Sequence, residues 1–268
     1  MEILVCVKRV PMVGGKIVVT ADGQDVDTRM SGFTVSPHEE CAVEEAVRLV
    51  EHHGGGVTVL TLGPPAAADQ LRDMLALGAS RAVLLETDGR EWGPIATAGA
   101  IVAAARGRTG DADAAAHPPA QLPYDLLLFG NEAADTGDYQ VGIRVACALG
   151  WPCVTGIKNL EITEGGTGAS ARAGREYRGG AEAFEFALPA VICVKEGINL
   201  PRYPSLPGRL RAKRAEIERH EPQWQEEGLR KRLLRVPAAE RKQATVLGTG
   251  ADAVPALIGV FEEWGVLP

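Results

Sequence analysis

Residues 126–142 carry the clearest indication of the fold. Leu126-Leu127-Leu128-Phe129-Gly130 runs directly into Asn131-Glu132-Ala133-Ala134-Asp135-Thr136-Gly137-Asp138-Tyr139-Gln140-Val141-Gly142. A short apolar run that ends at glycine predicts a strand buried on both faces. We expect a helix to begin near Asp138 and to end at Gly150. A strand, a glycine-rich loop and a helix in this order are typical of parallel sheets with helices packed on them.

The same alternation extends toward both ends of the chain. Further strands are predicted at residues 3–7, 57–62, 82–85 and 190–194, and helices at residues 36–53, 66–77 and 94–105. Residues 171–178 and 181–187 predict a β-hairpin that turns at Gly179-Gly180. Residues 16–35 predict a short extended excursion, and residues 107–123 predict a surface loop. We therefore expect an α/β fold with an open, mostly parallel Rossmann-like sheet, helices on both of its faces and an added hairpin.

Two boundaries can be placed from local sequence, one by capping residues and one by prolines. Ser36 can cap the first helix, Pro37 suits its first turn, and Glu39 can complete a capping box. Three prolines within residues 201–208 exclude a helix or a central strand there. We place a domain boundary here, with an α/β domain at 1–208 and an extended C-terminal arm at 209–268.

The arm ends in a predicted short helix. Asp252 is its expected cap, and an apolar stripe follows at helical spacing, formed by Val254, Leu257, Ile258 and Phe261. A stripe of this kind needs a covering surface, either in this chain or in a partner.

Composition narrows the class of protein. The chain has 268 residues, of which 46% are hydrophobic, 24% charged and 5% aromatic, enough for one substantial core. Its five cysteines form no CxxC pair and have no histidine at metal-ligand spacing, so neither a metal site nor disulfides are expected. Residues 3–7 are too short for a signal peptide or a membrane span. We expect a cytoplasmic protein.

The charge is unevenly distributed. The net charge is −7, yet residues 209–242 carry eleven Lys or Arg against six Glu, so this segment is +5 and the remainder −12. Such a segment can be a solvated helix face, a strip that docks on an acidic partner, or a nucleic-acid arm. Its basic residues alternate with Glu and Leu and lack aromatic spacing, which disfavours nucleic acid.

The candidate ligand site lies beyond the predicted strand ends at Val7, Leu62 and Phe129, because open parallel sheets bind ligands at their carboxyl edge. Neither GxGxxG nor GxxxxGK[ST] occurs. Glycines 130, 137 and 142 permit close backbone approach, and a following helix N-terminus offers free N–H groups to a phosphate. The alternative is an ordinary turn with capping residues, which would also account for Asp135 and Asp138.

No catalytic set emerges. The five histidines lie on predicted helix surfaces and loops, and no GxSxG, HExxH or paired-carboxylate arrangement appears. The sequence therefore favours a binding or carrier role over that of an enzyme.

Several segments, in order and spacing, resemble the electron transfer flavoprotein beta family. They cover most of the chain. The resembling segments are residues 5–11, 42–49, 59–64, 75–82, 188–191, 199–207 and 211–214, among which Asn199-Leu200-Pro201-Arg202-Tyr203-Pro204-Ser205-Leu206-Pro207 is the most specific.

The resemblance implies a fold, a cofactor and partners. The fold is the adenine-nucleotide α-hydrolase type of Rossmann-like sheet, in a subunit without an enzyme active site that pairs with an alpha subunit. The flavin FAD is shared with that subunit, AMP or a second FAD binds in the beta chain, and electrons pass from flavin-dependent dehydrogenases to a downstream acceptor. The implied nucleotide site comprises Cys6, Ser36, Leu62, Gly63, Gly130, Asp135, Asp138, Tyr139, Gln140, Val141 and Gly142. The implied partner-binding residues are Glu176, Arg202, Tyr203 and Leu206, with Leu206 as the anchor.

The chain departs from the family pattern at three positions. Ser36 stands where Asn is usual, Gly137 where an acidic residue is usual, and Leu200 where Glu is usual. Trp92 and residues 195–199 are closer to the electron-bifurcating and nitrogen-fixation-linked branch. The identity of the bound nucleotide and the branch therefore stay open.

Two rival functions share this sheet. A stand-alone adenine-nucleotide sensor of the universal-stress type would not need residues 195–268. An adenylating enzyme of related fold would need a pyrophosphate loop near residue 11, which is not found.

Overall fold

The computed structural model describes residues 1–12, 17–107, 122–165, 168–226, 228, 231–237 and 244–267. The chain forms two compact units, one of Met1–Lys16 with Asp27–Arg232 and one of Ile17–Val26 with Leu233–Pro268. The first unit contains the α/β fold. The boundary expected at residue 208 stays a prediction.

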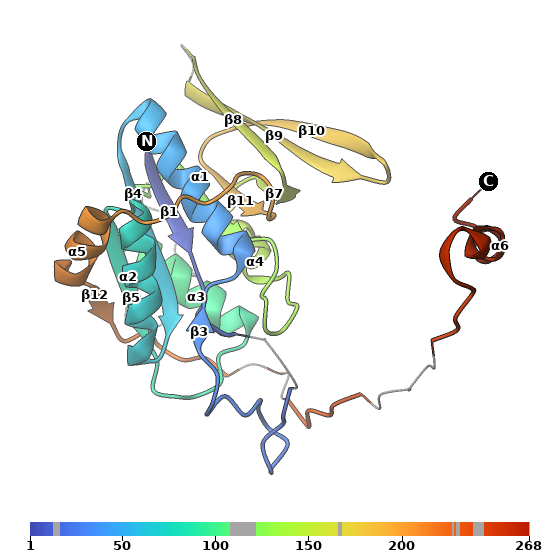
Figure 1. The fold of residues 1–268 in the computed structure, drawn as a ribbon. Coiled ribbons are helices and arrows are strands. Elements are labelled where there is room, and N and C mark those ends of the chain that lie inside the picture. The colour runs from blue at the N-terminus through green and yellow to red at the C-terminus, as the bar shows by residue number, and fades with distance from the viewer. Residues whose placement is uncertain are drawn as a thin grey trace. The chain divides into compact units, whose positions relative to one another are not determined.

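A parallel sheet forms the centre of the first unit (Figure 1). In spatial order its seven strands are β12 (Glu218–His220), β5 (Arg81–Glu86), β4 (Gly56–Gly63), β1 (Glu2–Cys6), β6 (Leu126–Gly130), β11 (Ala190–Val194) and β7 (Cys153–Ile157). The chain moves from β1 to β4 and β5, and then crosses back to β6 on the other side of β1. The strand order therefore reverses at β1 and β6, where open α/β sheets bind their ligands.

Helices cover both faces of this sheet, as predicted. On one face α1 (Pro37–His53) and α2 (Ala68–Leu77) pack on Ile3 and Val5. On the other, α3 (Pro94–Ala105) and α4 (Val141–Leu149) pack on Leu4 and Leu127. Successive residues of a strand point to opposite faces, so continuous apolar runs such as residues 3–7 supply both layers.

The start of α1 confirms the capping signals. The Ser36 hydroxyl accepts a hydrogen bond from the Glu39 backbone N–H at 3.3 Å, and Glu39 Oε2 accepts one from the Ser36 N–H at 3.0 Å. The helix ends at His53, with Gly54 at a positive φ of 74°.

A three-stranded antiparallel sheet adjoins the central one. It consists of β8 (Asn159–Gly165), β9 (Gly168–Tyr177) and β10 (Gly180–Ala187), and the β9–β10 pair is the predicted hairpin. Neither β8 nor β7 was predicted. Near the N-terminus, β2 (Val10–Pro11) pairs with β3 (Phe33–Thr34). The expected excursion at residues 16–35 thus contains β3, together with an isolated bridge between Val19 and Val26.

Four expectations of the sequence need correction. The helix expected near Asp138 begins at Val141, and Asp252 lies in the 3-10 turn Gly250–Ala253 before α6 (Val254–Glu263), whose N-cap is Ala253. A 3-10 turn, Pro65–Ala67, precedes α2. No strand was expected after residues 190–194, but β12 follows them in the chain.

The proline-rich segment also differs from its prediction. It enters helix α5 (Leu206–Arg214) rather than ending before it. Pro207 fits because it lies in the first turn, where a missing N–H has no helical partner to lose. The Ser205 hydroxyl caps the helix by accepting the Gly208 N–H at 3.1 Å. Of the loop expected at residues 107–123, residues 108–121 lie outside the described part of the chain.

In the second unit, the Leu234 N–H donates to the Gly23 carbonyl oxygen at 2.8 Å. Three residues of the predicted stripe on α6, Val254, Leu257 and Ile258, are exposed. Over the described residues, no helix has the length and apolarity needed to cross a membrane.

Candidate functional site

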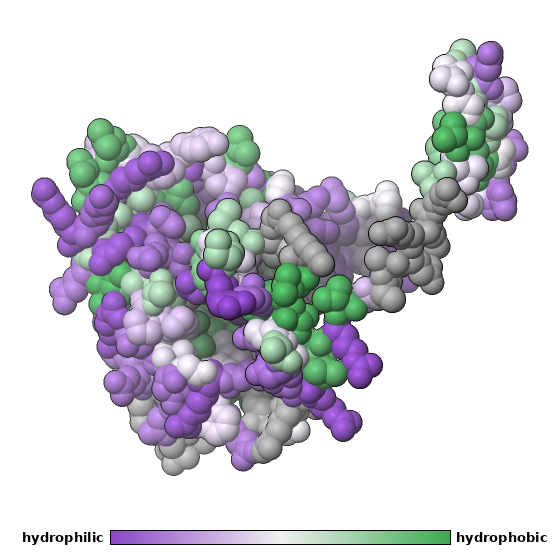
Figure 2. Space-filling view, turned by 60° about the horizontal axis from the view of Figure 1, so that its bottom comes forward, coloured by the Kyte–Doolittle hydropathy of each residue, from purple (hydrophilic) through white to green (hydrophobic). Residues whose placement is uncertain are grey.

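The predicted nucleotide-site residues gather at the carboxyl edge of the central sheet. Cys6 ends β1, Leu62 and Gly63 end β4, and Gly130 ends β6, on three adjacent parallel strands. Ser36 lies at the same edge, because α1 begins against the end of β6. Figure 2 turns this edge toward the viewer and shows mostly hydrophilic side chains.

The loop between β6 and α4 is folded on itself. The Ala133 N–H donates to the Asp138 carbonyl at 2.9 Å, and the Gly137 N–H donates to the Ala133 carbonyl at 2.8 Å. Gly137 has a φ of 67°, which favours glycine. The N-cap of α4, Gln140, makes no side-chain capping bond. The first N–H groups of α4 therefore have no helical partner and can receive an anion such as a phosphate.

Two glycines allow the elements of the site to approach closely. A Cβ atom on Gly142 would lie 2.7 Å from Cys193 Sγ and 3.3 Å from Phe129 Cγ. A Cβ atom on Gly130 would lie 2.8 Å from Glu39 Cγ. The backbone of α4 therefore rests directly on the sheet, and the start of α1 rests directly on the end of β6.

Gln140 connects the loop to α4. Its Nε2 donates to Asp138 Oδ1 at 2.8 Å, and its Oε1 accepts from Arg144 Nη2 at 2.7 Å. These bonds fix the side chain across the first turn of α4. Tyr139, in contrast, is about half exposed, and its hydroxyl donates to the Glu132 carboxylate.

Several polar residues of this edge were not predicted. Lys8 Nζ pairs with Asp135 Oδ2 at 2.8 Å. Glu132 Oε1 lies 3.6 Å from His38 Nε2, while His38 Nδ1 accepts the Glu196 N–H at 2.8 Å. The bond from Tyr139, followed by the nearby His38, lowers the pKa of Glu132. Only the position of Lys8 directly after a strand could have suggested its place.

Glu39 and Cys6 are ionisable groups with displaced pKa values. Burial raises the pKa of Glu39 to about 7, although hydrogen bonds from Ser36 and the charge of Lys8 oppose the rise. Burial, followed by the charge of Glu39, raises the pKa of the Cys6 thiol. Cys6 is therefore a neutral thiol near neutral pH, and it serves as a small apolar wall rather than as a nucleophile.

The predicted partner-binding residues occupy two places. Glu176 on β9 is largely exposed, pairs with Lys158 at 3.1 Å, and lines a cavity of about 330 Å³ that Tyr139 and Lys195 also line. Tyr203 is 95% exposed and Leu206 73%, so neither side chain is buried within this chain. Arg202 lies beside them, and its guanidinium binds Glu44 and Glu51.

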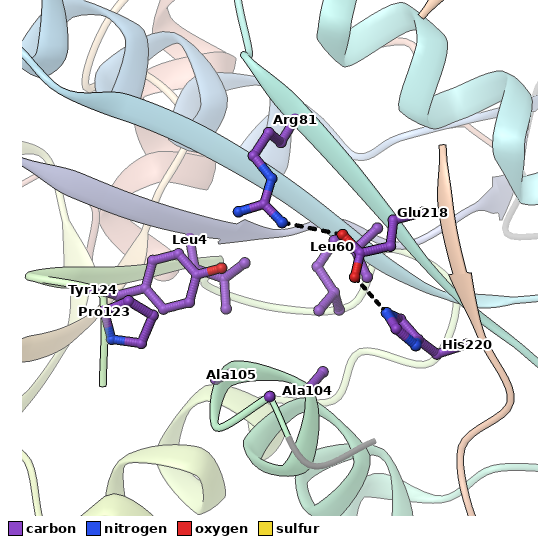
Figure 3. Close-up of a pocket in the computed structure, with 11 residues that line it drawn as sticks. Leu4, Leu60, Arg81, Ala104, Ala105, Pro123, Tyr124, Glu218 and His220 are labelled. Atoms are coloured by element: carbon purple, nitrogen blue, oxygen red, sulfur yellow. Dashed lines mark hydrogen bonds and ion pairs between the residues drawn. The ribbon is translucent and has the colours of Figure 1, made fainter. Parts of the chain in front are cut away.

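A second cavity lies at the opposite, amino-terminal edge of the sheet (Figure 3). Arg81 and His220 both point at the Glu218 carboxylate, with distances of 3.0 Å from Arg81 Nη2 and 2.6 Å from His220 Nε2. Tyr124 lies on the side of the cavity opposite Glu218, next to the apolar side chain of Leu4. Arg81 and His220 thus share one carboxylate, and this cavity lies apart from the predicted nucleotide site.

The parallel sheet, whose strand order reverses at β1 and β6, places the chain among Rossmann-like α/β proteins. Comparison with known proteins narrows the class. The electron transfer flavoprotein domain family matches residues 26–223. The electron transfer flavoprotein subunit beta of Bacillus subtilis (strain 168) is 35% identical over 221 residues, which is 81% of this chain and 78% of that protein. The mitochondrial electron transfer flavoprotein subunit beta of Oryza sativa subsp. japonica is 33% identical over 264 residues, 96% of this chain and 97% of that protein. The chain belongs to the electron transfer flavoprotein beta-subunit family.

Proposed function

We propose that this chain is the beta subunit of a heterodimeric electron transfer flavoprotein. It binds an adenine nucleotide, AMP or a second FAD, at the carboxyl edge of β4, β1 and β6. With the alpha subunit it holds the FAD that receives electrons from flavin-dependent dehydrogenases and passes them to an acceptor. The observation that carries the proposal is the meeting of the predicted site residues at the one edge where the strand order reverses.

The residues present fit a nucleotide. The uncapped N-terminus of α4, from Gln140 to Gly142, supplies N–H groups for a phosphate, and the close backbone packing at Gly130 and Gly142 leaves no side chain there. Cys6 and Leu62 would form the apolar wall at the strand ends. Lys8 neutralises Asp135, which reduces repulsion between this loop and a phosphate.

The bound flavin would supply the electron chemistry, and the protein would supply binding and orientation. No side chain of the proposed site is placed as a nucleophile: Cys6 is a neutral thiol, and His38 is held between Glu132 and the Glu196 N–H. We therefore propose an electron carrier without catalytic residues of its own. As its location we propose the cytoplasm.

The test is to purify the chain co-expressed with the product of the neighbouring gene. Two chains with flavin absorbance, and AMP or additional FAD released on denaturation, are expected. Calorimetry on nucleotide-stripped protein should show AMP or FAD binding, weakened in the Gln140→Ala variant while the melting temperature stays nearly unchanged. A single chain that binds adenine nucleotide without flavin would instead support the stand-alone sensor, and failure to bind either nucleotide would refute the site.

A further inference from the structure

The cavity at the amino-terminal edge of the central sheet has room for a small organic molecule (Figure 3). Its volume is about 300 Å³, at the lower end of the range of about 300–1,000 Å³ that is usual for ligand pockets. It is lined by strands β1, β4, β5 and β12, by the end of α3 and by the residues just before β6. The proposed nucleotide site, at the opposite edge, makes no use of it.

The interior of the cavity is apolar. Leu4 of β1, Leu60 of β4 and Val83 of β5 line it, and all three are buried. Ala104 and Ala105 in the last turn of α3 also line it, and their single methyl groups leave space between this helix and the sheet. A ligand with an apolar body would displace water from these side chains, which is favourable.

Glu218, the one carboxylate that lines the cavity, is already bound by two side chains of the protein. Its Oε2 accepts from Arg81 Nη2 at 3.0 Å, and its Oε1 lies 2.6 Å from His220 Nε2. The bond with His220 lowers the pKa of Glu218, burial opposes this, and the bond with Arg81 lowers it further, so the carboxylate is ionised near neutral pH. A cationic ligand would have to displace Arg81 or His220 to reach it.

The polar atoms left for a ligand are hydrogen-bond donors. Arg81 uses Nη2 for Glu218, and its Nη1 and Nε have no partner among the described residues. Figure 3 shows the guanidinium between Glu218 and Tyr124, with the Tyr124 hydroxyl pointing into the cavity. Burial raises the pKa of Tyr124, and a bond with Thr58 followed by the charge of Arg81 opposes the rise. A bond that stabilises the phenolate is one donated by Thr58, so the Tyr124 hydrogen remains available.

The end of α3 fixes the direction in which an anion would lie. The last carbonyl groups of a helix carry partial negative charge and disfavour a negative group beside them. Ala104 and Ala105 belong to this end, whereas Arg81 and Tyr124 lie away from it across the cavity. The negative group of a ligand would therefore face Arg81, and its apolar part would face α3.

We propose that this cavity binds a small carboxylic acid in its ionised form, with the carboxylate between Arg81 and Tyr124 and the apolar part against the interior of the cavity. Guanidinium and carboxylate form charge-assisted hydrogen bonds, which are stronger than those between neutral groups. Glu218 and His220 are positioning residues that hold the guanidinium in place. The site is independent of the proposed function, because it shares no residue with the nucleotide site.

The first test measures ligand affinity on the full-length chain by ligand-observed NMR. The probes are benzoate, with a planar apolar part, and hexanoate, with an extended one, and benzamide is the control because it has the shape of benzoate without the charge. At least one carboxylate should bind, and benzoate should bind at least about tenfold more tightly than benzamide. Failure of both carboxylates to bind, or equal affinity for benzoate and benzamide, would overturn the proposal.

The second test compares Arg81→Met with Arg219→Met. Arg219 also joins β12 to β5, through Glu86, but it lies between Glu218 and His220 in the strand and therefore points to the other face. Each variant loses one ion pair between these strands. Arg81→Met should weaken carboxylate binding at least about tenfold and abolish the preference over benzamide, while Arg219→Met stays within about twofold. An equal loss in both variants would assign the effect to a loosened sheet edge and overturn the direct contact.

Two further variants test the rest of the site. Ala104→Phe should fill the cavity and abolish carboxylate binding, and Tyr124→Phe should weaken it severalfold by removing one donor. AMP binding by calorimetry should be unchanged in both variants, because the nucleotide edge is not altered. Carboxylate binding that persists in Ala104→Phe and in Arg81→Met alike would place the ligand elsewhere and overturn the proposal, while leaving the proposed function intact.

Discussion

A side chain at position 142 would collide with Cys193 and Phe129, whereas one at position 99 of α3 would meet nothing within 4 Å. Both positions lie in helices, where alanine is intrinsically favoured over glycine. We expect Gly142→Ala to destabilise the fold by about 1–3 kcal/mol through overpacking, and Gly99→Ala to stabilise it by up to about 1 kcal/mol. Urea unfolding of the two variants would measure this, and a Gly142→Ala variant as stable as the wild type would contradict the packing described for α4.

Glu39 predicts a pH dependence of stability. Its pKa in the folded state, about 7, lies above its ordinary value of 4.5. Its contribution to stability is therefore fully present below about pH 4.5 and is lost as the pH rises through 7. Glu39→Gln keeps the capping box and removes the titration. The variant should gain stability relative to the wild type between pH 5 and pH 8, by up to about 3 kcal/mol in unfolding experiments. A constant difference across that range would show that Glu39 does not titrate near neutrality.

Ser36 and Glu39 show what the local sequence can predict. Ser36 and Glu39 were paired correctly from their spacing, because a capping box depends on neighbours three residues apart. The displaced pKa of Glu39 was not predictable, since it arises from burial against the end of β6, far away in the sequence.

Among the elements, those with strong apolar runs were predicted and those with mixed surfaces were missed. Residues 126–130 and 190–194 are buried on both faces, and their continuous apolar runs predicted the strands correctly. β7 and β12 lie at the two edges of the sheet, and their partly exposed or charged residues carry no such run. The start of α5 was missed because prolines were taken to exclude a helix, although its first turn tolerates them. The loop between β6 and α4 was located from its glycines, and its role as a phosphate loop stays a prediction. The Lys8–Asp135 pair joins residues too distant in sequence to be linked without the fold.

Arg72 tests how α5 is held. Arg72→Met keeps most of the side-chain methylenes and removes the donors to the carbonyls at the end of α5. We expect faster hydrogen exchange in residues 206–214 and a loss of about 1–2 kcal/mol of stability. Arg48→Met is the control, because Arg48 is exposed and its nearest carboxylate oxygen lies 3.9 Å away. An equal effect of both substitutions would show that α5 does not depend on Arg72.

For the chain as a whole, two truncations test the division into units. Ending the chain after Arg232 removes the second unit's C-terminal part and keeps α5 and β12. We expect this truncated chain to unfold cooperatively and to bind adenine nucleotide, but to associate poorly with the alpha subunit, because the exposed stripe of α6 is gone. Calorimetry and light scattering would measure the two properties.

Ending the chain after residue 208 would remove β12 and most of α5. The edge of β5 and the surface of α2 would then be uncovered, so this truncation should be markedly less stable than the one after Arg232. Equal stability of the two would support the boundary at residue 208.

The position of β1 in the chain differs from its position in the sheet. β1 precedes every other strand of the sheet in the chain, yet it lies in the interior of the sheet, between β4 and β6. Its second neighbour begins at Leu126, so at 5–20 residues per second the strand waits on the order of ten seconds for that partner. During this interval Ile3, Leu4 and Val5 have only part of their final packing. During synthesis β1 is therefore an apolar segment that a chaperone can bind, although in the folded protein its apolar residues are buried.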